Sequence, residues 1–268
     1  MSALTELKAK SPPPTYPPDE LLISEDGVNL ESDWHRIEIG LLVELCGQHL
    51  LGRTDYFAGG NMFIYFDEQH ARDRNFRGPD FFFVWGPSPM PLRPYWAVWK
   101  EGMRFPNLII ELLSPTTEDM DRTKKKDVYE RIFKTPEYYL YDPDTKQLEG
   151  WRLEDRVYQP SVPDSTGRLW SQQLELWLGL WDGWYLNRET TWLRFYTKDG
   201  ILVPTIEEAA KRQIAAVQKR SATAEQKAAT AEQKAATAAQ QADEQRRRAD
   251  AAEAELARLK ARLEPKKD

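Results

Sequence analysis

Apolar residues at helical spacing mark the first clear element of the chain. Ser32 and Asp33 are favourable N-cap residues, and the apolar positions after them recur every three or four residues, at Trp34, Ile37, Leu41 and Leu45. This pattern predicts an amphipathic helix that ends near Gly52. Cys46 lies between apolar neighbours on this helix and is expected in the core rather than as a reactive thiol.

Apolar runs rich in aromatic and β-branched residues predict the strands. Residues 108–113 read Leu-Ile-Ile-Glu-Leu-Leu, which is typical of a central strand covered on both faces. A charged helix is predicted at 118–133 and a long loop at 87–105. The other predicted strands are 61–66 (led in by 55–60), 80–85, 138–141, a hairpin of 147–153 with 157–159, and several short strands within 168–197. This order predicts an α/β fold with a mixed central sheet flanked by helices.

The two ends of the chain differ in composition from the middle. Residues 1–20 include the Pro-rich run 11–18, which favours extended polyproline geometry and predicts a strap before the domain at 21–204. Plain disorder explains this run equally well. From residue 205 Gly is absent, and Thr-Ala-Glu-Gln-Lys-Ala-Ala occurs at 223–229 and again at 230–236. The segment 205–268 is therefore read as an Ala-rich heptad helix.

The heptad register of this tail runs without a break. Ile214 and Leu256 occupy position a, Val217 and Leu259 occupy position d, and most of the a and d positions between them are Ala. A helix of 55–60 residues would be roughly 85 Å long. The pattern predicts a coiled-coil arm for oligomerisation or docking, and a homo-oligomer formed through this helix, with a solvated single helix as the alternative.

Composition limits the function classes and the compartment. The net charge is -6, and the part before Thr205 carries 23 basic and 32 acidic residues, which argues against tight nonspecific binding to duplex nucleic acid. Cys46 is the only cysteine, so there is no disulfide framework within the chain and no Cys-based zinc site. The charged N-terminus lacks a secretory apolar region, and no apolar run approaches the roughly 20 residues that cross a bilayer. We expect a soluble, cytoplasmic protein without a membrane partner.

Two acidic residues stand out on apolar strands. Asp80 opens one predicted strand, and Glu111 lies inside another. A carboxylate in such surroundings is costly to bury unless it meets a cation, and two carboxylates from adjacent strands can chelate a divalent ion. The structural alternatives are a strand-start residue for Asp80 and a buried ion pair for Glu111.

A lysine follows on the predicted helix. Asp121, Lys125 and Tyr129 are spaced four residues apart and share one helix face. Lys125 there can position an attacking water or offset charge on a phosphoryl group. The alternative is an ordinary solvated run of lysines at 124–126. Trp96 and Trp99 can stack on bases, although covering a core edge is the better explanation of both.

These motifs as a set resemble the PD-(D/E)xK nuclease superfamily, and within it the large bacterial Uma-two family of proposed endonucleases. The resemblance covers about residues 20–200. One departure is Lys134-Thr135, where the family usually has Gly-Val. The motifs that carry the resemblance are Pro79-Asp80, Glu111-Leu112-Leu113-Ser114, the Asp121/Lys125/Tyr129 helix and the segment from Pro136 to Pro143.

The resemblance implies a restriction-endonuclease-like domain with a metal site. Asp80 and Glu111 become the ligands of Mg2+, with Mn2+ as a substitute. Leu113 stands where the superfamily usually has its lysine, so Lys125 is assigned that role. The acidic residue of the first helix corresponds to Glu31 or Glu38, while His35 matches a family position without an assigned role and Tyr129 is a supporting residue.

The resulting functional hypothesis is a metal-dependent endonuclease that hydrolyses phosphodiester bonds of DNA. The first alternative is a catalytically silent protein that keeps the nuclease fold and acts through its coiled-coil arm. The second is a nucleic-acid-binding module without cleavage. That module would need a basic face, and the sequence offers only the short basic clusters 122–126 and 246–248.

Overall fold

The computed structural model describes residues 32–67 and 78–263, with side chains up to residue 260. The predicted strap at 1–20, Glu31 and most of the predicted 67–76 loop lie outside these residues. The chain divides into two compact units, Met1–Ile206 and Glu207–Asp268, and each is described separately. Among the described residues, no helix is both long and apolar enough to cross a bilayer.

The first helix, α1 (Asp33–His49), begins where the N-cap pattern predicts. The Ser32 hydroxyl accepts a hydrogen bond from the backbone N–H of His35, which satisfies one of the free donors of the first turn. The helix ends at His49, slightly before the predicted end near Gly52, and Leu50 forms its C-cap. Leu41, Leu45 and Cys46 are fully buried, so the prediction that Cys46 is a core residue is confirmed.

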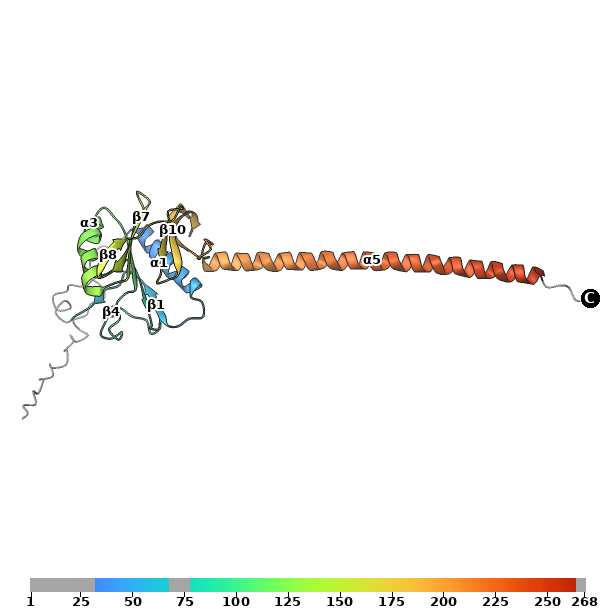
Figure 1. Cartoon of the computed structure of the whole chain (residues 1–268), viewed down its shortest axis with the longest axis horizontal. Coiled ribbons are helices and arrows are strands. Elements are labelled where there is room, and N and C mark those ends of the chain that lie inside the picture. Colours follow the sequence, from blue (N-terminus) through green and yellow to red (C-terminus); the bar gives the residue numbers. More distant parts are fainter. Residues whose placement is uncertain (1–31, 68–77, 264–268) are drawn as a thin grey trace, which may run out of the picture. The chain divides into compact units, whose positions relative to one another are not determined.

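A mixed six-stranded sheet forms the centre of the first unit (Figure 1), in the order β1-β3-β5-β6-β7-β8. Strands β5 and β6 are parallel, and the other neighbours are antiparallel. The predicted hairpin is present as β7 and β8. The strands are β1 (Tyr56–Gly59), β3 (Phe81–Trp85), β5 (Leu108–Leu112), β6 (Glu137–Asp142), β7 (Gln147–Glu154) and β8 (Val157–Pro160).

Both faces of this sheet are covered, as the apolar run at 108–113 predicts. Side chains alternate between faces along a strand. Leu108, Ile110 and Leu112 pack into one core with α1, whereas Ile109 packs into the other core with Tyr129 and Phe133. Glu111, two residues after Ile109, therefore points to the same side as Tyr129.

The predicted helix at 118–133 is one continuous helical run with two wide turns. Its segments are α3 (Glu118–Met120), the π-helical η2 (Asp121–Lys125), α4 (Lys126–Val128) and the π-helical η3 (Tyr129–Phe133). In a regular α-helix, residues four apart are rotated by about 40°, and a π turn, which holds more residues, reduces this rotation. The π turns thus help Asp121, Lys125 and Tyr129 to face the sheet together.

The prediction of a strand at 61–66 is only partly correct. Only β2 (Ile64–Tyr65) is extended and paired, and it pairs in parallel with β4 (Trp96–Ala97) outside the main sheet. The reason lies at Asn61, which has a φ of 48° and turns the chain away after β1. The predicted 87–105 loop therefore contains a short strand, and Trp96 is fully buried, which confirms that it is a core residue rather than a base-stacking one.

The short strands predicted within 168–197 form a second, antiparallel sheet beside α1. They are β9 (Leu169–Ser171), β10 (Leu176–Tyr185) and β11 (Arg188–Tyr196), in the order β11-β10-β9. Leu176, Leu178 and Phe195 from this sheet join the core that contains α1. With its mixed central sheet and flanking helices, this unit confirms the predicted α/β fold class.

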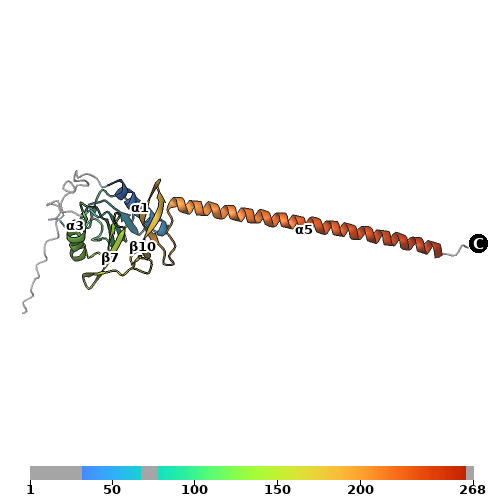
Figure 2. The same cartoon turned by 90° about the horizontal axis from the view of Figure 1, so that it is seen from above.

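The second unit consists of the long helix α5 (Ile206–Leu263), of 58 residues. Figures 1 and 2 show it as one continuous helix. The tail segment has no Gly before its end and only Pro265 beyond the helix, so no helix-breaking residue interrupts it. The predicted long C-terminal helix is therefore present.

Candidate active site

Asp80 and Glu111 face each other across two neighbouring strands. Strands β3 and β5 pair with Phe81 opposite Ile110, so extending this register by one residue brings Asp80 opposite Glu111. The backbone N–H of Asp80 donates to Oε2 of Glu111 at 3.1 Å. The backbone N–H of Leu112 donates to Oδ2 of Asp80 at 2.6 Å. The two carboxylates are thus bound to each other's strands.

The helix brings Lys125 and Tyr129 to the same place. The ammonium nitrogen of Lys125 lies 3.1 Å from Oε2 of Glu111. The hydroxyl of Tyr129 donates to the other oxygen, Oε1, at 2.8 Å. Tyr138, which pairs with Ile109 across β5 and β6, donates to the backbone carbonyl of Asp121 at 2.8 Å and so connects the first π turn to the sheet. The structure therefore brings together Asp80, Glu111, Lys125 and Tyr129.

Asp121 joins this cluster as a third carboxylate. Its Oδ1 lies 2.7 Å from the ammonium nitrogen of Lys125. This contact is an ion pair, and among the described residues the other carboxylate oxygen, Oδ2, is buried without a hydrogen-bond partner. The sequence pattern contained Asp121 at the correct spacing, but its exposed, charged surroundings gave no sign that it is buried.

The cluster is enclosed by the protein. Glu111 is fully buried, Asp80 is 6% exposed, and the Lys125 side chain is 14% exposed. Burial raises the pKa of Glu111 well above its ordinary range; Lys125 opposes this shift, and Asp80 and Asp121 add to it. Burial lowers the pKa of Lys125, but the carboxylates of Glu111 and Asp121 outweigh it and the net pKa is raised. Lys125 therefore keeps its proton in this cluster.

Gly60 is a further element of the site that the sequence analysis did not identify. A Cβ atom on Gly60 would lie 1.9 Å from the backbone oxygen of Asp80 and 2.7 Å from Cγ2 of Ile39. The next residue, Asn61, donates its backbone N–H to the same Asp80 oxygen at 3.2 Å. Only glycine allows this close approach, so the chain between β1 and β2 fixes the backbone of Asp80.

His35 reaches the site through the backbone. Its Nε2 lies 2.9 Å from the carbonyl oxygen of Leu112, which can only accept, so Nε2 donates. Its Nδ1 lies 2.7 Å from the hydroxyl of Ser32. The backbone of Leu112 is thus held at both polar groups: His35 donates to its carbonyl, and Asp80 accepts from its N–H. His35 supports the strand that holds Glu111 and does not contact either carboxylate in any described interaction.

Glu38 is directed toward the second sheet. It is fully buried, and its Oε2 accepts the backbone N–H of Leu193 at 3.4 Å. Burial raises its pKa well above the ordinary range, against the effects of the Leu193 N–H and Arg194. The described contacts of Glu38 connect α1 to β11, whereas those of Asp80 and Glu111 do not involve it. Glu31, the other candidate for this position, lies outside the described residues.

The charges of the cluster fit a divalent cation. When ionised, Asp80, Glu111 and Asp121 carry three negative charges against the single positive charge of Lys125. An excess of buried negative charge needs a cation or protonation. Carboxylate oxygens are the hard donors that Mg2+ binds, usually together with several waters. Within residues 32–67 and 78–263 no group of three or more His, Cys, Asp or Glu side chains is arranged to hold a metal.

Comparison with known proteins identifies the class. Residues 26–198 match the model of the Uma2 family, described as "Putative restriction endonuclease". This segment is well over half of the 268-residue chain, so the chain belongs to that family. The resemblance to the Uma-two family that the sequence motifs indicated is confirmed.

A solved structure also resembles part of this chain. The crystal structure of "a putative nuclease belonging to DUF820 from Anabaena variabilis" is similar with a TM-score of 0.37 and 16% sequence identity. The similarity covers 52% of this chain and 73% of that chain. No curated protein matches the chain.

Proposed function

We propose that this protein is a metal-dependent endonuclease that hydrolyses DNA phosphodiester bonds at the cluster of Asp80, Glu111 and Lys125. The observation that supports this most strongly is the 3.1 Å contact between Lys125 and Glu111. The superfamily's usual lysine position is occupied by Leu113, which is buried in the same core as Tyr129. A lysine from the helix therefore supplies the charge that the strand lacks.

Each residue has a role that follows from its contacts. Asp80 and Glu111 would hold Mg2+ or Mn2+. Such an ion, when bound, polarises a phosphate oxygen and lowers the pKa of a bound water. Tyr129 fixes the orientation of the Glu111 carboxylate through Oε1, while Asp80 is fixed by the Leu112 N–H.

Lys125 would act as a fixed positive charge rather than as a base. The neighbouring carboxylates raise its pKa, so it remains protonated at neutral pH. A protonated ammonium can donate hydrogen bonds to a phosphoryl oxygen and stabilise the negative charge that develops during attack by water. The assignment of DNA as the substrate rests on membership of the restriction endonuclease family.

The first experiment is a cleavage assay with labelled single-stranded and double-stranded DNA and with RNA, in Mg2+, in Mn2+ and in chelator. We compare the wild type with Asp80→Asn and Glu111→Gln. Asp127→Asn is the matched control, because Asp127 is exposed on the same helix and pairs only with Arg131 among the ion pairs described. We expect metal-dependent cutting by the wild type and by the control, and its loss in both site variants.

A non-catalytic protein that keeps the nuclease fold is the second candidate. It is favoured by the fact that both oxygens of Glu111 already have protein partners, Tyr129 on Oε1 and Lys125 with the Asp80 N–H on Oε2. In that case Glu111 is a structural ion-pair member. Absence of both metal-binding heat and cleavage in the wild type would establish this candidate and reject the endonuclease.

A further inference from the structure

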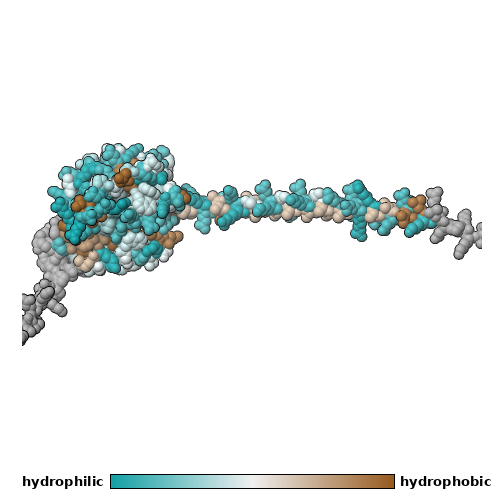
Figure 3. Space-filling view, viewed as in Figure 1, coloured by the Kyte–Doolittle hydropathy of each residue, from teal (hydrophilic) through white to brown (hydrophobic). Residues whose placement is uncertain are grey.

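Large apolar side chains are exposed at both ends of α5. Ile214 and Val217 are each 58% exposed near its start, and Leu256 and Leu259 are 54% and 53% exposed near its end. They occupy positions a and d of one heptad register, and Ala fills most of the a and d positions between them. Figure 3 shows this as a pale-brown band along the helix with a brown patch near its end. Such a seam is the pattern of a helix that pairs with another.

Charged residues at the e and g positions beside this seam have a definite order. In a parallel pair, a residue at g lies next to the e residue five positions later in the partner helix. Every charged g–e combination of this kind in α5 is of opposite sign. The four are Arg220 with Glu225, Lys227 with Glu232, Arg248 with Glu253, and Glu255 with Lys260.

The four charged residues in the middle of α5, Arg220, Glu225, Lys227 and Glu232, form no ion pair within the described part of their own helix. Ion pairs along a helix form between residues three or four apart. Arg220, Lys227 and Glu232 have no charged residue at those distances on either side, and Glu225 has only the hydroxyl of Ser221, at 3.2 Å. By contrast, Lys211 pairs with Glu207 and Arg247 with Asp243 at i,i+4. The four central charges are therefore available to a partner.

An antiparallel pair would lose this complementarity. The antiparallel alignment that matches Ile214 with Leu259 brings g residues beside g residues and e residues beside e residues. It would pair Arg220 with Glu255 and Glu225 with Arg246, but it would also oppose Lys227 to Arg248 and Lys211 to Lys260. Like charges at such positions oppose association. The charge order thus selects the parallel, in-register arrangement.

We propose that α5 binds α5 of a second copy of this chain in a parallel, in-register, two-stranded coiled coil. The seam is Ile214, Val217, Leu256 and Leu259 with the alanines between them, and the g–e pairs set direction and register. Because both helices follow residue 206 in their own chains, the two nuclease-family units are attached at the same end of the pair. This proposal does not depend on catalysis.

Charge reversal in the full chain tests the partner and the register together. In a dimer of Arg220→Glu/Lys227→Glu, the new glutamates face Glu225 and Glu232 of the second copy. In a dimer of Glu225→Lys/Glu232→Lys, the new lysines face Arg220 and Lys227 of the second copy. Each variant alone is expected to dimerise at least about tenfold more weakly than the wild type, because four interhelical pairs become repulsive. An equimolar mixture of the two restores every pair as attractive and is expected to regain the dimer.

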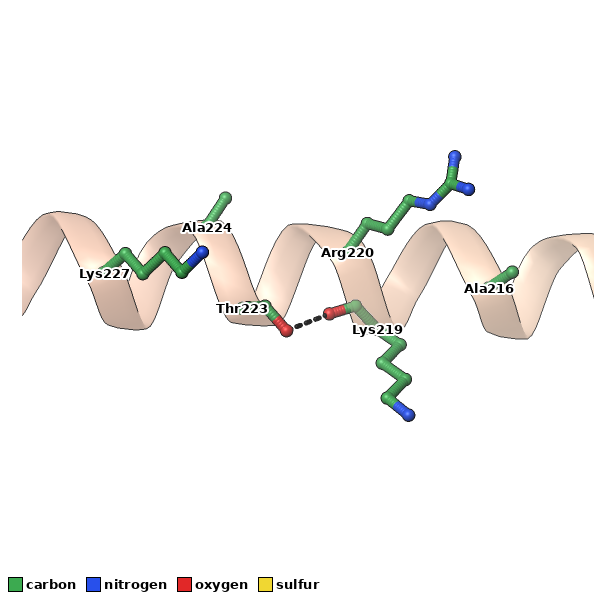
Figure 4. A pocket seen from close by; sticks show the side chains of 6 residues that line it. All are labelled: Ala216, Lys219, Arg220, Thr223, Ala224 and Lys227. Carbon is green, nitrogen blue, oxygen red and sulfur yellow. Dashed lines mark hydrogen bonds between the residues drawn. The ribbon is translucent and has the colours of Figure 1, made fainter.

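The control reverses charges on the opposite side of the same helix. Figure 4 shows Arg220 on the same side as the d-position Ala224, with Lys219 pointing to the other side. Arg212→Glu/Lys219→Glu, at two f positions, changes the net charge as much as Arg220→Glu/Lys227→Glu does and should leave the dimer intact.

Sedimentation equilibrium provides the mass, and circular dichroism checks that each variant stays helical. The proposal requires a wild-type mass near twice the 31.2 kDa of one chain that falls toward one chain at high salt. A monomeric wild type at micromolar concentration, or a mixture of the two variants that stays monomeric while the f-position control dimerises, would overturn it.

Discussion

The ammonium nitrogen of Lys125 lies 3.1 Å from Oε2 of Glu111, and the same oxygen accepts the backbone N–H of Asp80. One carboxylate oxygen on a central strand thus joins a helix lysine to the neighbouring strand. This contact brings a lysine to the cluster of carboxylates from the helix, although β5 itself carries no lysine. The following predictions test the residues around it.

Replacing Lys125 with Met should reduce cleavage by about 10²–10³-fold, because a fixed positive charge near the reacting phosphate is lost. It should also destabilise the fold at neutral pH, since Glu111 and Asp121 then remain buried without their cation. Lys124→Met is the matched control, because Lys124 is exposed one residue earlier. Equal cleavage rates for the two variants would show that Lys125 has no role in cleavage and serves only the ion pairs of the cluster.

The Tyr129 hydroxyl should matter for both stability and cleavage. Tyr129→Phe leaves Oε1 of Glu111 without its donor, which should cost about 1–3 kcal/mol in the free energy of unfolding. Tyr141→Phe removes a comparable hydroxyl, which donates to the carbonyl of Thr191 at 3.0 Å in the other core. Denaturant unfolding should show a loss in both variants, whereas only Tyr129→Phe should slow cleavage. If Tyr129→Phe cleaves at the wild-type rate, the Tyr129 hydroxyl has no role in cleavage.

Gly60 should tolerate no side chain. Gly60→Ala places a methyl group 1.9 Å from the Asp80 backbone oxygen, so the strand start must move and Asp80 with it. We expect a loss of stability of about 1–3 kcal/mol together with loss of cleavage. The control is Gly40→Ala, where an added methyl meets nothing within 4 Å in the middle of α1. That variant should gain up to about 1 kcal/mol, and a neutral Gly60→Ala would refute the close approach.

Glu38 should make the stability of the protein depend on pH. Its folded pKa lies well above the ordinary 4.5 because of burial, so the folded state favours the neutral carboxyl. The raised pKa of Glu38 therefore contributes fully to the free energy of unfolding below about pH 4.5, and this contribution is lost as the pH rises through the folded pKa. The loss is about 1.4 kcal/mol for each unit by which the folded pKa exceeds the unfolded pKa. The uncharged Glu38→Gln should become more stable than the wild type as the pH rises, and nearly equal to it in acid.

Urea titrations across this pH range measure the difference, with the exposed Glu189→Gln as a control that should follow the wild type. If Glu38→Gln is instead less stable than the wild type at neutral pH, then Glu38 is ionised, and the Leu193 N–H together with the positive charge of Arg194 outweighs burial.

Much of the fold could be predicted from local patterns. The apolar run at 108–113 identified β5 and its two covered faces, and the N-cap at Ser32 located the start of α1. The pairing of Asp80 with Glu111 could be predicted because each is an acidic residue on an apolar strand, where a buried carboxylate needs a partner. The spacing of Asp121, Lys125 and Tyr129 likewise indicated a shared face.

The remaining features depend on contacts between distant parts of the chain. Glu38 meets the Leu193 backbone across 155 residues of sequence, and nothing near Glu38 specifies that strand. The segment 61–66 is rich in strand-forming residues, but the positive φ at Asn61 removes it from the main sheet. The burial of Asp121 follows from the π turns and from the Tyr138 contact, neither of which has a local sequence signature.

The nicking of supercoiled plasmid by the full chain, measured under single turnover as Mg2+ is titrated, tests the central claim most directly. The comparison is between the wild type and Glu111→Gln, with circular dichroism to show that both are folded. The account predicts wild-type nicking that saturates with Mg2+, stops in chelator and falls at least about 100-fold in Glu111→Gln. Nicking at equal rates by both proteins, or none by a wild type that binds Mg2+, would contradict it.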